Sequence, residues 1–261
     1  MICDTCGTSN QAGANFCIQC GTRLASGCPA CGHANLPGAH FCANCGSQLP
    51  AVTAPAAAGG VGPPIAMAVA ERRLVSVLFA DLVGFTTMAE EMTPEEVMAL
   101  LRDFHGRMEE EVFRHGGCLE KFIGDALLAT FGVPDPGPRD ATDTLACARG
   151  MRAALDIWNR ERAAAGLPAL RMGLGLHHGP VVAGDIGSRR NMAFATVGDT
   201  TNVTSRLQAL TRDLGTGLVV SGALVAAAER EGADPAVLAG LSARGPHVLR
   251  GRDTPIEVWT E

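Results

Sequence analysis

The chain has 261 residues, of which 47% are hydrophobic, and it carries a formal net charge of -6. This is enough apolar material for one substantial domain and a smaller module. The acidic balance argues against a nucleic-acid partner, which usually selects a basic surface. No apolar run reaches the roughly 18 residues of a membrane-spanning helix, and residues 1–4 lack the basic and apolar segments of a signal peptide. We therefore expect a cytoplasmic protein without a membrane partner, in which paired cysteines bind metal rather than form disulfides.

Eight of the ten cysteines lie in residues 1–49, where they form two copies of the pattern CxxC-x10-CxxC. The second copy repeats the first 25 positions later, with similar flanking residues, which indicates a tandem repeat. Two CxxC turns direct four thiolates at one cation, as in structural zinc sites. Each copy is too short to fold on an apolar core of its own. We predict two zinc ions per chain, one held by Cys3, Cys6, Cys17 and Cys20 and the other by Cys28, Cys31, Cys42 and Cys45.

This segment resembles a double zinc ribbon, with a redox dithiol or an iron centre as the alternatives to zinc. We interpret it as a docking or regulatory module for a protein partner. DNA binding is the alternative, but Arg23 is the only lysine or arginine in residues 1–49. Residues 50–70 are uncharged and rich in Pro, Ala and Gly, which predicts a linker. Residues 71–261 then form the larger domain.

The larger domain begins with an apolar run over residues 74–82, which predicts a buried strand. A helix is expected from Gly84, and another from Thr93, where a capping threonine, a proline and two glutamates precede an amphipathic segment. The remaining expected elements are strands over 118–122 and 126–131, a helix around 145–158, strands over 170–177 and 181–186, a strand over 194–198, a helix capped by Asp199, and a closing hairpin over 248–259. This order predicts an α+β, ferredoxin-like (split βαβ) fold: an antiparallel sheet with helices on one face.

Two aspartates stand at the ends of apolar runs. Asp81 ends the first strand, and Asp125 lies in the turn after the second. In a split βαβ fold these two strands run the same way on either side of the third, so both carboxylates lie at the same end of the sheet. Such a pair suits hard divalent cations and substrate phosphates, and the backbone after Asp81 leads into a helix N-terminus that suits a phosphate. The simpler interpretation of Asp125 is that it stabilises a hairpin turn.

A second polar group lies on the helix after residue 199. Asn202 and Arg206 are four residues apart and therefore share one helix face. An amide and a guanidinium placed this way suit a phosphate or another oxyanion. Without further context, they could equally form a solvated polar stripe.

Several motifs together resemble class III nucleotidyl cyclases: FADLVGFT at residues 79–86, KFIGDALLATFG at 121–132, GLGLHHGPVVAGDIG at 173–187 and TVGDTTNVTSRL at 196–207. The resemblance covers about residues 72–260 and is greatest to the bacterial adenylate cyclase domain. It implies conversion of ATP to 3′,5′-cyclic AMP and pyrophosphate. It also implies a homodimer, because the aspartates of one chain face the remaining site residues of the other.

The resemblance further implies a role for each matching residue. Two Mg²⁺ or Mn²⁺ ions would be held by Asp81 and Asp125 with the Leu82 carbonyl, and the β- and γ-phosphates by the backbone of Val83, Gly84, Phe85 and Thr86. Lys121 would read adenine, Asn202 would orient the ribose, Arg206 would neutralise the α-phosphate in the transition state, and Arg250 would meet the terminal phosphates.

One position departs from the family pattern. The residue seven before the asparagine, usually Asp or Thr, helps the lysine to read adenine, and here it is Ala195. Thr196 is adjacent, but strand alternation points it to the other face. Base discrimination would then be weaker, or left to Lys121 and backbone groups. Two alternatives remain: a non-catalytic cyclase-like domain that binds nucleotide and signals by dimerising, and a guanylate cyclase, although the guanylate form typically has an acidic residue at the place of Lys121.

Overall fold

The computed structural model describes residues 8, 9, 19, 44, 45, 47, 70–188 and 191–261. Of the predicted zinc ligands only Cys45 is among them, so both predicted zinc sites lie outside the described residues. The chain divides into two compact units, Met1–Ile65 and Ala66–Glu261. The second unit contains both aspartates and the helix that carries Asn202 and Arg206.

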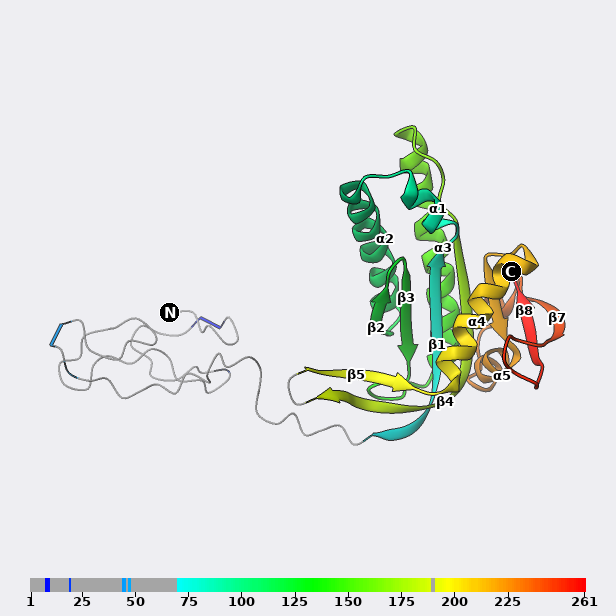
Figure 1. Cartoon of the computed structure of the whole chain (residues 1–261). Helices are drawn as coiled ribbons and strands as arrows, with labels where there is room; N and C mark the ends of the chain where they lie inside the picture. The colour runs from blue at the N-terminus through cyan, green and yellow to red at the C-terminus, as the bar shows by residue number, and fades with distance from the viewer. Residues whose placement is uncertain (1–7, 10–18, 20–43, 46, 48–69, 189–190) are drawn as a thin grey trace. The chain divides into compact units, whose positions relative to one another are not determined.

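The larger unit is built on one eight-stranded sheet (Figure 1). The strand order is β2-β3-β1-β4-β6-β8-β7, and β5 pairs with β4 beside this path. The strands are β1 (Glu71–Leu82), β2 (Cys118–Ile123), β3 (Ala126–Phe131), β4 (Met172–Ser188), β5 (Asn191–Val197), β6 (Leu218–Ser221), β7 (Ser242–His247) and β8 (Ile256–Thr260). β1 and β2 flank β3 and run the same way, as the split βαβ pattern predicts. The α+β fold is confirmed, but the sheet is mixed rather than wholly antiparallel, because β4 and β6 are parallel.

Helices cover both faces of this sheet, which corrects the expectation of a single helical face. The helices are α1 (Phe85–Glu90), α2 (Pro94–Arg114), α3 (Asp140–Ala164), α4 (Asp199–Leu214), α5 (Gly222–Arg230) and α6 (Pro235–Leu238). The main core packs α2, α3 and α5 against the face that carries Leu78 and Leu174. On the opposite face α4 packs against β6 and β8 through Val203 and Leu207.

Glycines in β4 explain why a helix can lie on that second face. A Cβ at Gly175 would overlap the backbone of Thr204 and Gln208 in α4, and one at Gly173 would overlap the side chain of Thr211. Without these two Cβ atoms, α4 lies directly on the strand. Because Gly173 pairs with Asp81, α4 also passes over the end of β1.

The strands expected over 170–177 and 181–186 are one continuous strand, β4. The expected break covered residues 178–180, which include Pro180, a residue without an N–H donor. In the structure the Pro180 carbonyl accepts a hydrogen bond from the Thr200 hydroxyl at 2.7 Å, on the side away from β1. A strand residue directs its N–H and C=O to the same side, so Pro180 removes no hydrogen bond from the β1–β4 ladder.

The predicted boundaries of two further elements need correction, and that of a third is confirmed. Gly198, not Asp199, is the N-cap residue of α4, because the Asp199 carboxylate is paired with Arg252 instead. The closing hairpin is formed by β7 and β8, so residues 248–252 are loop rather than strand. The start of α2 is as predicted, with a reciprocal capping box between Thr93 and Glu96. In the described part of the chain, no helix combines the length and apolar character that a membrane crossing needs.

Candidate active site

Asp81 and Asp125 meet at one end of the sheet. Asp81 is the penultimate residue of β1, and its partner across the ladder is Ala126, the first residue of β3. Asp125 directly precedes Ala126 in the β2–β3 turn, so the turn brings the second carboxylate beside the first. The two side chains lie within hydrogen-bonding contact.

This proximity changes the acidity of Asp81. Burial, followed by the hydrogen bond and negative charge of Asp125, raises the pKa of Asp81 from 3.8 to about 6, while Arg212 opposes the rise. The Asp81 side chain is 18% exposed. Two carboxylates held together in such a place repel each other unless a proton or a cation lies between them.

Two residues of α4 also contact Asp81, and the sequence analysis missed both. The Arg212 guanidinium donates to Asp81 Oδ2 at 3.2 Å, and the Gln208 side-chain amide donates to the same oxygen at 3.5 Å. Gln208 and Arg212 are four residues apart and share a helix face. The spacing could have identified the pair as a contact of Asp81 only if the crossing of α4 over the end of β1 had been known.

The oxygen atoms at this place suit hard divalent cations such as Mg²⁺ and Mn²⁺. Among the described residues, no group of three or more His, Cys, Asp and Glu side chains could hold a metal ion. Asp81 and Asp125 are the acidic side chains that this end of the sheet offers to a cation, and the Leu82 carbonyl follows Asp81 directly in the chain. The raised pKa of Asp81 fits this role, because a cation would offset both the burial of the ionised carboxylate and its repulsion by Asp125.

The segment after Asp81 is only partly available as a phosphate cradle. Gly84 has φ 78°, a left-handed conformation that favours glycine, and it leads into α1. The Val83 N–H donates to the Arg171 carbonyl at 2.8 Å. This amide is therefore already committed within the protein, and any cradle would consist of the amides of Gly84, Phe85 and Thr86.

Lys121 lies on β2, four residues before Asp125, with a half-exposed side chain (50%). Its ammonium is 3.6 Å from a carboxylate oxygen of the neighbouring Glu120. The other Glu120 oxygen accepts a hydrogen bond from the Thr196 hydroxyl of β5. Strand alternation was expected to take Thr196 away from the lysine, but the structure connects the two through Glu120.

Asn202 and Arg206 lie on a different side of α4 from the residues that contact Asp81. Asn202 is exposed and Arg206 is half-buried, with the Arg206 guanidinium close to Gly251 in the β7–β8 loop. Arg250, in the same loop, is exposed. A cavity of about 410 Å³ lies at the start of α4 and is lined by Arg72, His177, Pro180, Val181, Val182, Val197, Gly198, Asp199, Thr200 and Arg252.

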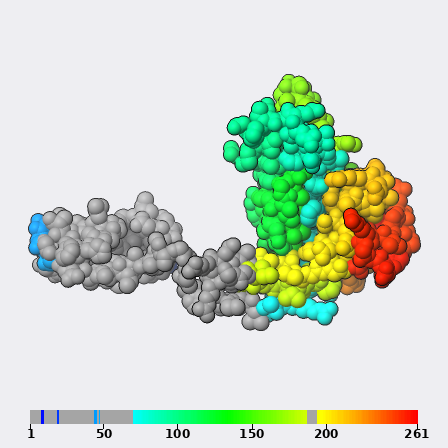
Figure 2. Space-filling view, viewed as in Figure 1, coloured from blue at the N-terminus to red at the C-terminus, as the bar shows by residue number. Residues whose placement is uncertain are grey.

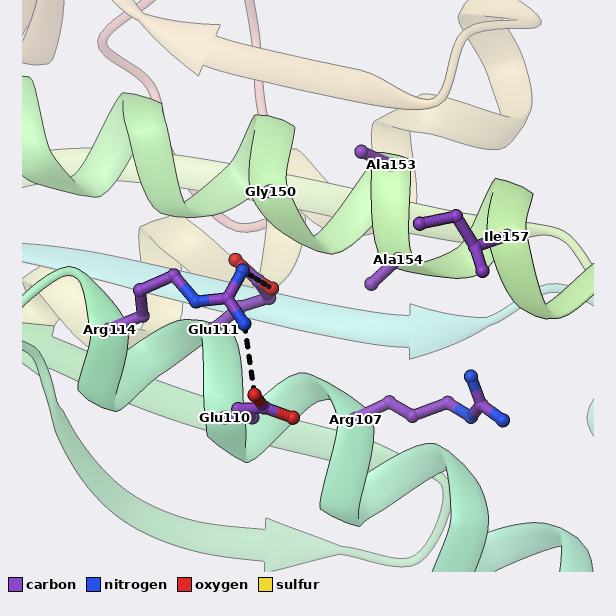
Figure 3. A pocket seen from close by; sticks show the side chains of 8 residues that line it. All are labelled: Arg107, Glu110, Glu111, Arg114, Gly150, Ala153, Ala154 and Ile157. Carbon is purple, nitrogen blue, oxygen red and sulfur yellow. Dashed lines mark hydrogen bonds and ion pairs between the residues drawn. The ribbon is translucent and has the colours of Figure 1, made fainter.

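A second depression, of about 250 Å³, lies between α2 and α3 (Figure 3). Arg114 pairs there with Glu110 and Glu111, and Ile157 lies on the α3 side. None of the residues that line it has a role in the sequence analysis. It is therefore not part of the candidate site.

Comparison with known proteins identifies the two parts of the chain. Residues 67–258 match the family model of the adenylate and guanylate cyclase catalytic domain, and residues 3–50 match that of the double zinc ribbon. Adenylate cyclase 1 of Rhizobium meliloti is 36% identical over 155 residues (59% of this chain), and the adenylate cyclase of Anabaena cylindrica is 35% identical over 165 residues (62%). The chain spans only 23% and 32% of the length of these two relatives.

Solved structures agree with this assignment. The guanylyl cyclase Cya2 is 32% identical, with a TM-score of 0.64 over 73% of this chain and 92% of that one. The adenylyl cyclase CyaB from P. aeruginosa is 23% identical, with a TM-score of 0.63 over 73% of this chain and 94% of that one, and shows the same fold. The chain thus belongs to the class III adenylate and guanylate cyclase family, with a double zinc ribbon before its catalytic domain.

Proposed function

We propose that the larger domain is an adenylate cyclase, which converts ATP to 3′,5′-cyclic AMP and pyrophosphate at a site shared by two copies of the chain. The observation that carries this proposal is the carboxylate pair of Asp81 and Asp125, held at one sheet end in a cyclase fold. The curated relatives named as adenylate cyclases support the choice of ATP. So does the basic residue Lys121, at the place where the guanylate form typically has an acid.

Asp81, Asp125 and the Leu82 carbonyl would hold two Mg²⁺ or Mn²⁺ ions, which when bound activate the ribose 3′-hydroxyl and neutralise phosphate charge. The amides of Gly84, Phe85 and Thr86 would bind the β- and γ-phosphates. Together these groups form the metal and triphosphate half of the site. Arg212 and Gln208 would share the Asp81 carboxylate with these ions, because both side chains donate to its Oδ2.

The other half comprises Lys121, Asn202 and Arg206, with Arg250 beside it. Lys121 would bind the adenine edge, Asn202 would orient the ribose, and Arg206 would neutralise the α-phosphate as charge develops. Arg250 would meet the terminal phosphates. Removing a cation such as Arg206 from a phosphoryl-transfer site costs about 10²–10⁵ in rate.

The geometry of one protomer supports a composite site. Arg206 and Gln208 are two residues apart on α4, so their side chains leave the helix about 200° apart. Gln208 contacts Asp81, which turns Arg206 away from the carboxylates. On β2, Lys121 pairs with Leu128 of β3, whereas Asp125 lies in the turn that follows Ile123. We therefore infer that the second half of the site comes from another copy of the chain.

Exposed apolar side chains lie toward both ends of the sheet. Val182, Ile186 and Val197 on the β4–β5 hairpin are large and exposed, as are Phe122 and Ile123 beside the aspartate turn at the other end of β1. Such groups favour a protein interface at each place. A two-fold dimer would bury them and create two complete sites.

A guanylate cyclase is the second candidate, favoured by two observations. Ala195 lacks the side-chain group that would help Lys121 to read adenine, and the guanylyl cyclase Cya2 is 32% identical. The experiment that decides is incubation of the full chain with Mn²⁺ and either ATP or GTP, with cyclic product quantified. Cyclic AMP as the main product is expected. No cyclic product at dimer-forming concentrations would leave the non-catalytic nucleotide-binding module as the better reading.

The composite site has its own test. Asp81→Ala and Arg206→Ala chains should each be inactive alone and regain activity when mixed, because one of the two sites in the heterodimer is then whole. Heterodimers that form and remain inactive would refute the shared site. We further propose that the double zinc ribbon binds two zinc ions through its eight cysteines and regulates the domain by binding a protein partner.

A further inference from the structure

Glu120 is a buried carboxylate next to the base-reading lysine. Its side chain is only 2% exposed, although β2 is otherwise largely accessible along this stretch. Glutamate is rarely buried to this degree without a partner. Within the described residues its oxygen Oε1 has no hydrogen-bond partner, whereas Oε2 accepts from Thr196.

An irregularity in β2 explains the direction of this side chain. Leu119 pairs with Ala129 and Lys121 pairs with Leu128, so Glu120 is an extra residue in a β-bulge. A bulge interrupts strand alternation and re-aims the side chains at that point. The Glu120 carboxylate can therefore lie near both the Lys121 ammonium and a residue of another strand.

That other strand is β5, which is not a neighbour of β2 in the sheet order. Figure 1 shows β5 running past the end of β2 and β3, and in Figure 2 the yellow band that contains β5 adjoins their green surface. Thr196 is itself buried, and its hydroxyl donates to Glu120. A chain of polar contacts thus runs from Thr196 through Glu120 to Lys121.

We propose that Glu120 and Thr196 position the Lys121 ammonium and thereby supply the base selection that Ala195 cannot provide. This inference rests on the proposed role of Lys121 as the adenine reader. Lysine is a point charge on a flexible stem, so it selects a base only if something fixes its direction. Thr196 holds Oε2 of the carboxylate, and this leaves Oε1 facing the ammonium at 3.6 Å.

The test compares ATP with GTP in variants of the full chain. Thr196→Val keeps the shape and β-branching of the side chain but removes the hydroxyl, and Glu120→Gln removes only the charge. Each should lower the ratio of kcat/KM for ATP to that for GTP about tenfold, mainly through a higher KM for ATP, which is the scale of one hydrogen bond to a charged group. Thr196→Ser, which keeps the hydroxyl, should give the same ratio as the wild-type chain.

Thr130→Val is the matched control. Thr130 is a buried strand threonine whose hydroxyl has no hydrogen-bond partner among the described residues. Its replacement should leave the ratio unchanged. General damage to the fold would lower turnover of both nucleotides together and would not move the ratio, which separates a positioning role from a structural one.

Equilibrium binding of 3′-deoxy-ATP and 3′-deoxy-GTP, which lack the hydroxyl needed to cyclise, separates this inference from the proposed function. If the chain forms no cyclic product but prefers 3′-deoxy-ATP, and Thr196→Val abolishes that preference, the function is wrong and the positioning role stands. If the chain makes cyclic AMP and both variants keep the full preference for ATP, the positioning role is wrong. A wild-type chain without a base preference, or one that binds neither nucleotide, would also overturn it.

Discussion

Replacing Asp81 with asparagine should stabilise the metal-free protein at neutral pH. The pKa of this carboxyl is raised from 3.8 to about 6, first by burial and then by Asp125. At neutral pH the folded chain therefore contains an ionised Asp81 carboxylate in surroundings that disfavour its charge. Asparagine keeps an oxygen that can accept from Arg212 and Gln208 but carries no charge.

The size of the effect follows from the shift. A rise of about two pKa units corresponds to about 3 kcal/mol at about pH 7.5, where Asp81 is ionised in both folded and unfolded chains. Because the folded pKa is the higher one, the ionised carboxylate destabilises the fold above about pH 6, and this penalty fades as pH falls toward the unfolded value of 3.8. Near pH 4 only about 0.5 kcal/mol of difference should remain.

Urea unfolding in a chelator measures this directly, at about pH 7.5 and about pH 4. The difference in free energy of unfolding between Asp81→Asn and wild type should be large at the higher pH and small at the lower. Asp213→Asn, an exposed neighbour on α4, is the control and should change stability by less than about 0.5 kcal/mol at either pH.

Adding Mn²⁺ should remove most of this difference in stability. At about 100 times its dissociation constant a ligand of the folded state adds about 2.7 kcal/mol, and Asp81→Asn should lose most of this gain. A variant that is less stable than wild type in chelator at neutral pH, or a difference that does not vary with pH, would refute the repulsion on which the metal site is argued.

Three further outcomes are expected. Gly175→Ala should destabilise the domain by about 1–3 kcal/mol, because the new Cβ overlaps the α4 backbone, and a neutral result in urea unfolding would contradict the close packing of α4 on β4. Thr93→Ala should cost about 1 kcal/mol by removing the capping box of α2, whereas Thr254→Ala at an exposed loop position serves as the comparison. Chelation of zinc should abolish the calorimetric transition of residues 1–49 and leave that of residues 71–261 in place, so loss of both would argue against two independent domains.

The order of the elements was predictable because each carries a local signal. The capping box at Thr93 and the apolar run before Asp81 specify a helix start and a buried strand without reference to the rest of the fold. The effect of Pro180 could not be predicted in this way, because it depends on which side of the strand its nitrogen faces. That side is set by the register of β4 against β1, and the Pro180 carbonyl meets Thr200 on the other side.

Only the part of the site that depends on the order and direction of the strands could be predicted from the sequence. Asp81 and Asp125 follow from strand order, since a hairpin turn must lie beside the strand that its second arm pairs with. Arg212 and Glu120 were not foreseeable in the same way. The first depends on α4 crossing the sheet on glycines, and the second on a bulge, and neither the crossing nor the bulge could be placed from the sequence alone.

Arg212 gives a test in which the result depends on which chain of a mixed dimer carries the substitution. Its contact with Asp81 is within one chain, whereas Arg206 would serve the partner. In a mixed dimer of Arg206→Ala and Asp81→Ala chains, the only whole site uses the aspartates of the Arg206→Ala chain. Arg212→Gln placed in that chain should lower the Mn²⁺ concentration for half-maximal activity about two- to fivefold, the scale of a partly exposed ion pair. The same substitution in the Asp81→Ala chain should leave it unchanged. An equal effect from both chains would mean that Arg212 acts on the dimer as a whole and does not compete with metal for Asp81.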